Sequence, residues 1–371
     1  MDKTLINSKL ELVIQKLMNL DAPDMAMDKD TPLEEQLKGL VARDFGIREW
    51  DWPQGVGLYG LLQLQKARGT TEFDAFLLNW VEENLAIGQP SANINTTAPY
   101  LTLFDLSERY EKPEWEALCK ERAMFLMDTL PKTKEGGFEH LTSALGDRNG
   151  VWRHPDELWV DTLFMAVLFL GKMGVRYQNV AWIDEAVYQF LLHIRYLSDK
   201  QTGLLYHGWT FEAMNNFGGI FWNRGNSWFT YGAIAFLDAM GDSIRSADRR
   251  IILNAWLNQV NRLVALQDAG GLWHTILDKP DTYIETSGSG AITAGILYGI
   301  RCGILDSSYL PAAKNAVSGL LSYVGEDGVV GNVSAGTAVG MNAEHYENIM
   351  IRPMAYGQSL TALALIEALY L

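Results

Sequence analysis

The sequence has little of several things that would indicate other classes of protein. Only two cysteines, Cys119 and Cys302, occur in 371 residues, and both fall in helical patterns. They cannot form a disulfide framework, and the N-terminus lacks the basic start and apolar stretch of a signal peptide. We therefore expect a cytoplasmic protein. No apolar run is long enough to span a bilayer, so no membrane partner is expected.

Basic residues are also scarce. The chain has 30 Lys and Arg against 45 Asp and Glu, which gives a formal net charge of −15. A general nucleic-acid-binding protein needs a basic surface, so no nucleic-acid partner is expected. A small anionic ligand is not excluded, because one well-placed arginine outweighs the global charge locally. Nothing in the sequence indicates the oligomeric state.

Several motifs that carry metals, nucleotides or nucleophiles are missing. The histidines lack HxH and HExxH spacings, and there is no GxSxG, no P-loop and no GxGxxG after a strand. Neither cysteine lies in a polar, reactive setting. We therefore expect no metal and no cofactor.

Helical periodicity, in contrast, is abundant. Apolar residues recur at helical spacing, with almost no apolar/polar alternation. Helix starts carry caps such as Thr31-Pro32-Leu33-Glu34, and Gly69, Gly88 and Gly174 fall where helices should end. A short helix is expected at 32–43. The twelve main predicted helices are 8–20, 53–68, 72–87, 97–110, 113–130, 156–173, 179–196, 223–241, 246–266, 287–303, 308–323 and 355–370.

These helices alternate between two kinds. Helices apolar nearly all round should be buried, and helices with one charged face should lie at the surface. The apolar ones begin at 53, 97, 156, 223, 287 and 355. Those with a charged face begin at 72, 113, 179, 246 and 308. This alternation predicts an all-α fold, an (α/α)6 barrel of six helical hairpins, with the whole chain, 1–371, as a single catalytic domain.

Unusual polar and aromatic residues gather at the start of each predicted inner helix. Helix caps explain Ser, Thr, Asn and Asp there, but they do not require Trp, His and Arg. Because the inner helices run parallel, these clusters should meet at one end, where six helix N-termini favour a carboxylate ligand. The six clusters are 49–54, 93–97, 154–161, 206–209 with 222–228, 273–274 with 285–289, and 345 with 352–354.

Asp161 interrupts the apolar run LWVDTLFMAVLFL. An unpaired buried carboxylate is costly, so Asp161 must be paired, protonated or facing water. A hydrogen bond to a neighbouring loop is the structural alternative. The functional interpretation is a carboxyl whose raised pKa keeps it partly protonated as a general acid.

Arg224 lies between Trp222 and Trp228 in the sequence. An arginine between tryptophans suits bidentate binding of a substrate carboxylate beside a surface on which a sugar ring stacks. A structural ion pair is the alternative for Arg224.

Five segments, LWVDTLF, GLLYHGW, FWNRGNSW, GLWH and ETSGSG, occur in this order. Together they resemble glycoside hydrolase family 105, the unsaturated rhamnogalacturonyl and related unsaturated glucuronyl hydrolases. The resemblance runs from about residue 50 to the C-terminus. It implies an (α/α)6 barrel, and a substrate whose non-reducing end is a 4,5-unsaturated uronic acid left by a polysaccharide lyase.

The resemblance also implies a mechanism. Asp161 would protonate C4 of the vinyl ether, and water activated by the same carboxylate would add at C5. The hemiketal would then open and expel the aglycone, unlike the two-carboxylate chemistry of ordinary glycosidases. The residues that the resemblance places in the substrate site are His207, Trp222, Arg224 and Trp228, with Trp52 and His140 as wall residues.

Two positions depart from the family pattern. Asn95 stands where some relatives have a second aspartate, and it is the second candidate catalytic position. Asparagine hydrogen-bonds a hydroxyl or orients water but cannot take a proton at neutral pH, which puts two-carboxylate versions of the mechanism in doubt. Leu141 replaces a basic residue seen in some relatives.

Three other functions stay open. A non-catalytic carbohydrate-binding protein would not need the Asp161 carboxyl. An inverting glycosidase needs a second carboxylate, for which the candidates are Asp51, Glu285 and Glu344. A sugar epimerase relies on histidines, for which the candidates are His207, His274 and His345.

Overall fold

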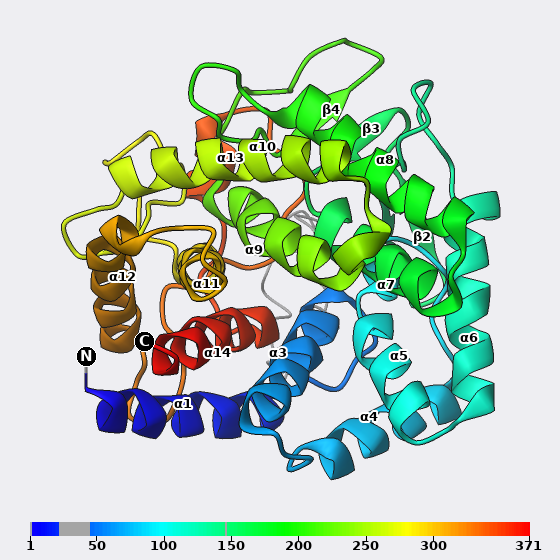
Figure 1. Cartoon of the computed structure of the whole chain (residues 1–371), viewed down its shortest axis with the longest axis horizontal. Helices are drawn as coiled ribbons and strands as arrows, with labels where there is room; N and C mark the ends of the chain where they lie inside the picture. The colour runs from blue at the N-terminus through cyan, green and yellow to red at the C-terminus, as the bar shows by residue number, and fades with distance from the viewer. Residues whose placement is uncertain (1, 22–44, 145–146) are drawn as a thin grey trace, which may run out of the picture.

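The computed structural model describes residues 2–21, 45–144 and 147–371. Its long helices form two concentric rings (Figure 1). The inner ring consists of α3 (Trp52–Arg68), α5 (Tyr100–Arg109), α7 (Leu168–Tyr177), α9 (Asn223–Met240), α11 (Thr286–Arg301) and α14 (Ala355–Leu369). The outer ring consists of α1 (Lys3–Met18), α4 (Asp74–Ile87), α6 (Pro113–Met124), α8 (Val180–Leu197), α10 (Ser246–Ala265) and α12 (Leu310–Ser322).

This arrangement confirms the (α/α)6 barrel. The expected helix at 32–43 lies outside the described residues, and a single domain over 1–371 stays a prediction. None of the helices in the described ranges is long and apolar enough to cross a membrane.

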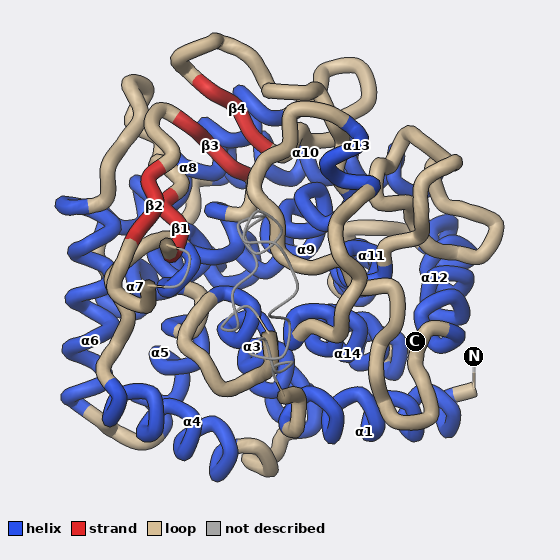
Figure 2. The backbone as a smooth tube through the Cα atoms, turned by 180° about the vertical axis from the view of Figure 1, so that it is seen from behind, coloured by secondary structure: helices blue, strands red, loops and turns tan. Residues whose placement is uncertain are grey.

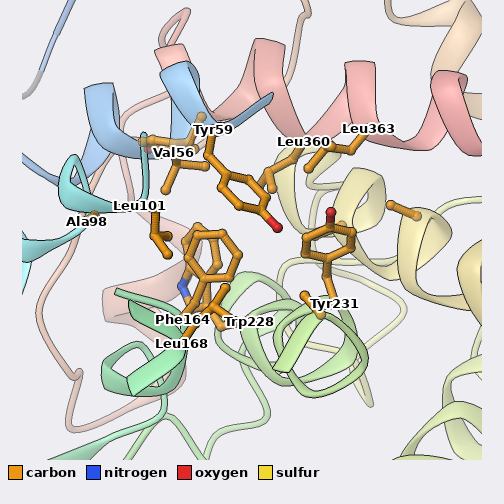
Figure 3. Packing of buried hydrophobic residues seen from close by; sticks show 14 of the residues in the cluster. Val56, Tyr59, Ala98, Leu101, Phe164, Leu168, Trp228, Tyr231, Leu360 and Leu363 are labelled. Atoms are coloured by element: carbon orange, nitrogen blue, oxygen red, sulfur yellow. The ribbon is translucent and has the colours of Figure 1, made fainter. Parts of the chain in front are cut away.

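Burial follows the two kinds of helix. In α9 every residue from Asn223 to Leu237 is buried, as expected for an inner helix that neighbours cover on all sides. In α8 the buried residues form one stripe toward the barrel, and the other face stays in solvent. The barrel interior is closed by aromatic rings (Figure 3). Phe164 packs against Trp228 at 5.3 Å and Tyr59 at 5.5 Å between ring centroids, so the axis is a packed core.

The predicted helix at 156–173 is wrong in its first turn. Asp156 has a positive φ of 55°, and Glu157–Trp159 forms a short strand, β3, that pairs antiparallel with β4 (Gly208–Thr210). The helix begins with a π-helical turn, η5 (Leu163–Val167), and continues as α7. Cross-strand pairing with a segment about 50 residues away replaced local helix propensity here. Asp161 therefore lies in the turn between strand and helix, not inside a helix.

The second inner helix also begins differently from the expected 97–110. A 3-10 turn, η3 (Asn95–Thr97), precedes α5, and Pro99 sits directly before its first residue. Proline suits this place, because its missing N–H is not needed there. Asn95 thus belongs to a separate turn that precedes the N-terminus of α5.

Loops and strands cover one end of the barrel (Figure 2). A hairpin of β1 (Leu141–Ser143) and β2 (Val151–Arg153) lies there beside the β3–β4 pair. The short helix α13 (Ala343–Glu347) is in the same layer. The remaining short helices are η4 (Phe125–Thr129), η6 (Gly241–Ser243) and η7 (Ser307–Tyr309).

Inner helices approach closely at glycines, which gives a test of the packing. A Cβ on Gly295 of α11 would lie 2.7 Å from the backbone oxygen of Thr230 on α9. We expect Gly295→Ala to lower the free energy of unfolding by about 1–3 kcal/mol, because backbone atoms have to move. Gly232→Ala on α9 is the matched control, since its Cβ would meet nothing nearer than 3.6 Å. Urea unfolding measures both variants, and equal stability of the two would contradict this packing.

Candidate active site

The clusters that precede the inner helices meet at the loop-covered end of the barrel. Trp52, at the start of α3, stacks on Tyr356 of α14 at 4.6 Å and contacts Trp228 of α9 edge-on at 6.0 Å. Arg224 at the start of α9 reaches Ser287 of α11. The turns η3 and η5 contact each other as well. Segments scattered over some 300 residues of sequence therefore form one group of side chains.

Asp161 and His207 form the centre of this group. Oδ2 of Asp161 lies 3.2 Å from Nε2 of His207. The pairing of β3 with β4 continues as a hydrogen bond from the Val160 N–H to the His207 carbonyl, at 3.0 Å, which fixes the two residues side by side. The side chain of Asp161 is 16% exposed, whereas His207 is buried. Neither of these two facing atoms has another hydrogen-bond partner among the described residues.

The pKa of Asp161 is lowered, and the expectation of a raised pKa is wrong for this structure. Burial raises the pKa of this carboxyl. The neighbouring His207 ring, through its electrostatic effect and its hydrogen bond, acts in the opposite direction, and the net effect lowers the pKa. The sequence shows only the apolar run around Asp161 and not the partner that lies beside it. Without a bound ligand, Asp161 is therefore a carboxylate.

Tyr346 orients His207, and sequence reasoning missed it. The Tyr346 hydroxyl lies 2.8 Å from Nδ1 of His207 and accepts a hydrogen bond from the Gly340 N–H at 2.9 Å. The hydroxyl proton is thus left for Nδ1, and a neutral His207 then carries its own proton on Nε2, facing Asp161. Tyr346 is fully buried on α13. Its neighbour His345 drew attention in the sequence, but His345 is exposed and bonds Thr337.

His140 forms the other wall beside Asp161. Its ring stacks on Trp159 at 4.3 Å, and its Nδ1 lies 2.8 Å from the Thr162 hydroxyl. Burial lowers the pKa of His140 to about 3, so the ring is neutral at ordinary pH. Trp159 also faces His207 at 5.7 Å, which makes it a second site residue that the sequence analysis did not select.

Trp222 and Trp228 belong to the same group of side chains as Asp161 and His207, and their role in substrate binding stays a prediction. Trp222 packs against His207 at 4.4 Å, and Trp228 forms the floor together with Phe164. The indole N–H groups of Trp222 and Trp228 are buried and have no acceptor among the described residues. Asn95 is half-buried in η3, and no hydrogen bond of its side chain is found within the described ranges.

The guanidinium group of Arg224 is largely occupied by hydrogen bonds to other residues of the protein. Its Nη1 donates to the carbonyl and hydroxyl of Ser334 at 2.7 and 2.6 Å, and its Nη2 donates to the Ala335 carbonyl at 2.7 Å. Nη1 also lies 3.7 Å from the Glu285 carboxylate. A bidentate contact with a substrate is thus not offered in this arrangement, which favours the ion-pair alternative. A single contact through Nε, which has no hydrogen-bond partner among the described residues, stays a prediction.

The three carboxylates considered for an inverting glycosidase either cap helices or lie at the surface. Glu285 is fully buried and caps α11, accepting from the N–H groups of Gly288, Ser287 and Ser334. Asp51 caps α3. Glu344 is exposed on α13. No hydrogen bond or ion pair joins Glu285 or Glu344 to Asp161 in the described part of the chain.

The histidines proposed for an epimerase do not surround one point. His207 contacts Asp161, whereas His274 bonds the Thr282 carbonyl and lies 3.7 Å from Asp268. Among the described residues, no group of three His, Cys, Asp or Glu side chains is arranged to hold a metal ion.

A twelve-helix α/α barrel with a carboxyl, histidines and tryptophans at the starts of its inner helices belongs to the class of (α/α)6-barrel sugar enzymes. Residues 35–371 match the family model described as Glycosyl Hydrolase Family 88. The chain therefore belongs to this glycoside hydrolase family.

Individual relatives agree. The chain is 33% identical over 332 residues to the unsaturated rhamnogalacturonyl hydrolase YesR of Bacillus subtilis, which covers 89% of this chain and 93% of that protein. A crystal structure of a possible GH105 member from Salmonella enterica serovar Paratyphi A has a TM-score of 0.89 and 31% identity, over 100% of this chain and 95% of the other. The unsaturated glucuronyl hydrolase of Bacillus sp. GL1 shares the fold, with a TM-score of 0.69 at 18% identity over 99% and 97% of the two chains. The resemblance to family 105 is confirmed.

The role of Arg224 is testable through stability. We expect Arg224→Met to lower the free energy of unfolding by about 3–5 kcal/mol, because Glu285 keeps its buried charge and loses its cation. Arg249→Met is the control: Arg249 also donates to two backbone carbonyls, those of Leu237 and Gly241, but at the surface. Its loss should cost about 0.5–1.5 kcal/mol. Denaturant unfolding measures the stability of both variants. If Arg224→Met costs no more stability than the control, the structural ion pair is rejected and direct substrate binding is the better interpretation of Arg224.

Proposed function

We propose that this glycoside hydrolase removes the 4,5-unsaturated uronic acid from the non-reducing end of lyase-generated oligosaccharides, with Asp161 as both acid and base. One observation carries the proposal. Asp161 faces a histidine at 3.2 Å, and the other carboxylates considered are taken up by helix caps or lie at the surface. A site with one working carboxyl suits hydration of a double bond better than a displacement that needs two carboxylates. The names of the relatives, unsaturated rhamnogalacturonyl and glucuronyl hydrolases, agree with this chemistry.

The reaction balances with one carboxyl. Asp161 gives its proton to C4, and positive charge develops between C5 and the ring oxygen. A water molecule adds at C5 and returns a proton to the Asp161 carboxylate. The hemiketal opens to a ketone at C5, which leaves C1 as a hemiacetal that expels the aglycone. We assign to Asn95, in the turn η3 that contacts η5, the holding of this water or of a sugar hydroxyl.

The first step needs a protonated Asp161, and binding of the substrate favours that protonation. Asp161 without ligand is ionised, since His207 outweighs the burial of its carboxyl. A bound uronate brings a like charge and excludes water, and both raise the pKa of a carboxyl. The proton therefore moves onto Asp161 when the substrate is in place. His207, the indole N–H groups of Trp222 and Trp228, and the helix N-termini are the donors toward the substrate carboxylate.

We further propose that the enzyme works in the cytoplasm on products of an extracellular or periplasmic lyase. Cys119 and Cys302 are both free thiols, which agrees with a reducing compartment.

The decisive experiment follows the ultraviolet absorbance of the conjugated double bond. Wild-type protein, with chelator present, is incubated with unsaturated oligosaccharides made by lyases from pectin, rhamnogalacturonan and glycosaminoglycan. We expect loss of absorbance with the preferred substrate and a fall in kcat of about 10²–10⁴-fold in Asp161→Asn, because the general acid is gone. Asp184→Asn, an exposed aspartate on α8, is the control. A folded wild type that consumes no panel member would reject the hydration mechanism.

The pH profile tests the pairing of Asp161 with His207. His207→Gln removes the imidazole whose electrostatic effect and hydrogen bond lower the pKa of Asp161, so the pKa of Asp161 rises. Because the acid form of Asp161 starts the reaction, the alkaline limb of kcat/KM is expected to move to higher pH, even as the maximal rate falls. The profile is measured from about pH 4 to about pH 9, an interval that spans the usual pKa values of carboxyl and histidine side chains. A limb that stays in place or moves to lower pH would show that His207 does not set the charge of Asp161.

A further inference from the structure

Trp152 is an exposed aromatic residue beside the site to which the reaction so far gives no role. Its side chain is 54% exposed on strand β2, although large aromatic residues are usually covered. The opposite side of its ring is stacked on His154, with centroids 5.8 Å apart and planes within 17°. The ring is thus held in place on one side and open to solvent on the other.

A continuous series of rings joins Trp152 to the reacting carboxyl. His154 contacts Trp159 at 4.5 Å, and Trp159 stacks on His140 at 4.3 Å and faces His207. His207 lies against Asp161. Trp152 is therefore at the outer end of the wall whose inner end holds Asp161.

The hairpin that carries Trp152 is fixed to the site on both sides. The Ile94 N–H donates to the Leu141 carbonyl at 3.2 Å, and Asn93 donates to the Ser143 hydroxyl at 3.1 Å, which ties β1 to the cluster that contains Asn95. On the other side, the His140 N–H donates to the Glu157 carbonyl at the start of β3. The hairpin is therefore held on one side by the segment before η3 and on the other by the start of β3, and Figure 2 shows the strands β1 to β3 side by side.

The face of the hairpin that bears Trp152 is uncharged. Alternate residues of a strand share a face, so Trp152 and His154 lie on one side, and Thr142 lies opposite Trp152 in register. Burial lowers the pKa of His154 to about 4, so this ring is neutral. Arg153 points to the other face, where Glu139 binds it through two hydrogen bonds. Among the residues of β1 and β2, no cationic side chain lies on this face to bind a sulfated or acidic ring.

We infer that Trp152 is a stacking platform for an uncharged sugar ring of the aglycone, beyond the unsaturated uronyl residue that reacts at Asp161. This inference rests on the proposed function. An open indole face beside a polar site suits the apolar face of a pyranose, and the fixed hairpin lowers the entropy lost on binding. The platform makes the enzyme favour longer substrates with neutral sugars over short or sulfated ones.

The test compares three substrates of the same unsaturated uronate: a methyl glycoside, a trisaccharide with two neutral sugars, and the same trisaccharide with sulfate on those sugars. We expect Trp152→Ala to raise KM for the neutral trisaccharide by about 3- to 10-fold, with kcat little changed. The effect on the methyl glycoside should be several-fold smaller, and Trp152→Phe should restore most of the loss. Wild type should prefer the neutral over the sulfated trisaccharide, and Trp152→Ala should reduce that preference.

Val151→Ala is the matched control, because Val151 is a 45% exposed neighbour on the opposite face of the same strand. It should leave all three KM values within about twofold, as for most surface substitutions. Equal losses on the methyl glycoside and the trisaccharide in Trp152→Ala would assign a structural role to the hairpin and overturn the platform. No loss on either would overturn it as well. If wild type consumes none of the three substrates, it is the proposed function that fails.

Discussion

The close approach of the Asp161 carboxylate to the His207 ring is the interaction on which the rest of the site depends. A buried carboxylate is costly unless a partner compensates its charge, and here one histidine at 3.2 Å provides that compensation. The surrounding structure serves to hold this pair. The β3–β4 pairing brings the two residues together, Tyr346 orients the imidazole, and Trp159 and Trp222 pack against its faces. These contacts come from three separate parts of the chain: β3 with β4, the segment before α9, and α13.

The barrel explains how an acidic protein can accept an acidic sugar. The chain carries a formal charge of −15, yet the site gathers helix N-termini, indole N–H groups and a histidine. Local donors in a water-poor environment act more strongly than distant surface charges, which solvent and salt screen. The negative surface sets the solubility of the protein, whereas the end of the barrel sets what it binds.

Sequence reasoning reached the barrel because its signals are local. Helical periodicity and caps report on neighbouring residues, and the alternation of α8-like and α9-like helices needs no knowledge of contacts. The same reasoning selected Asp161, since a charge in an apolar run is visible in one segment. It failed where long-range pairing decides. Strand β3 exists because Leu158 lies opposite Trp209, and Tyr346 matters because it meets His207 over 139 residues of separation. The lowered pKa of Asp161 has the same origin.

Glu285 and Asp161 show how a structural carboxylate differs from the one that we propose as the acid and base. Both are largely buried at the starts of inner helices; Glu285 lies near the Arg224 guanidinium, and Asp161 lies near the His207 ring. Glu285 accepts hydrogen bonds from three backbone N–H groups and two serine hydroxyls, so its oxygens are occupied and its charge is fixed. Asp161 faces a single ring nitrogen, and its Oδ2 has no further donor among the described residues. A proton can therefore reach Asp161 at small cost when a negative ligand arrives, whereas protonating Glu285 would break several hydrogen bonds at once. The number of fixed donors, rather than burial, decides which carboxyl is able to exchange protons.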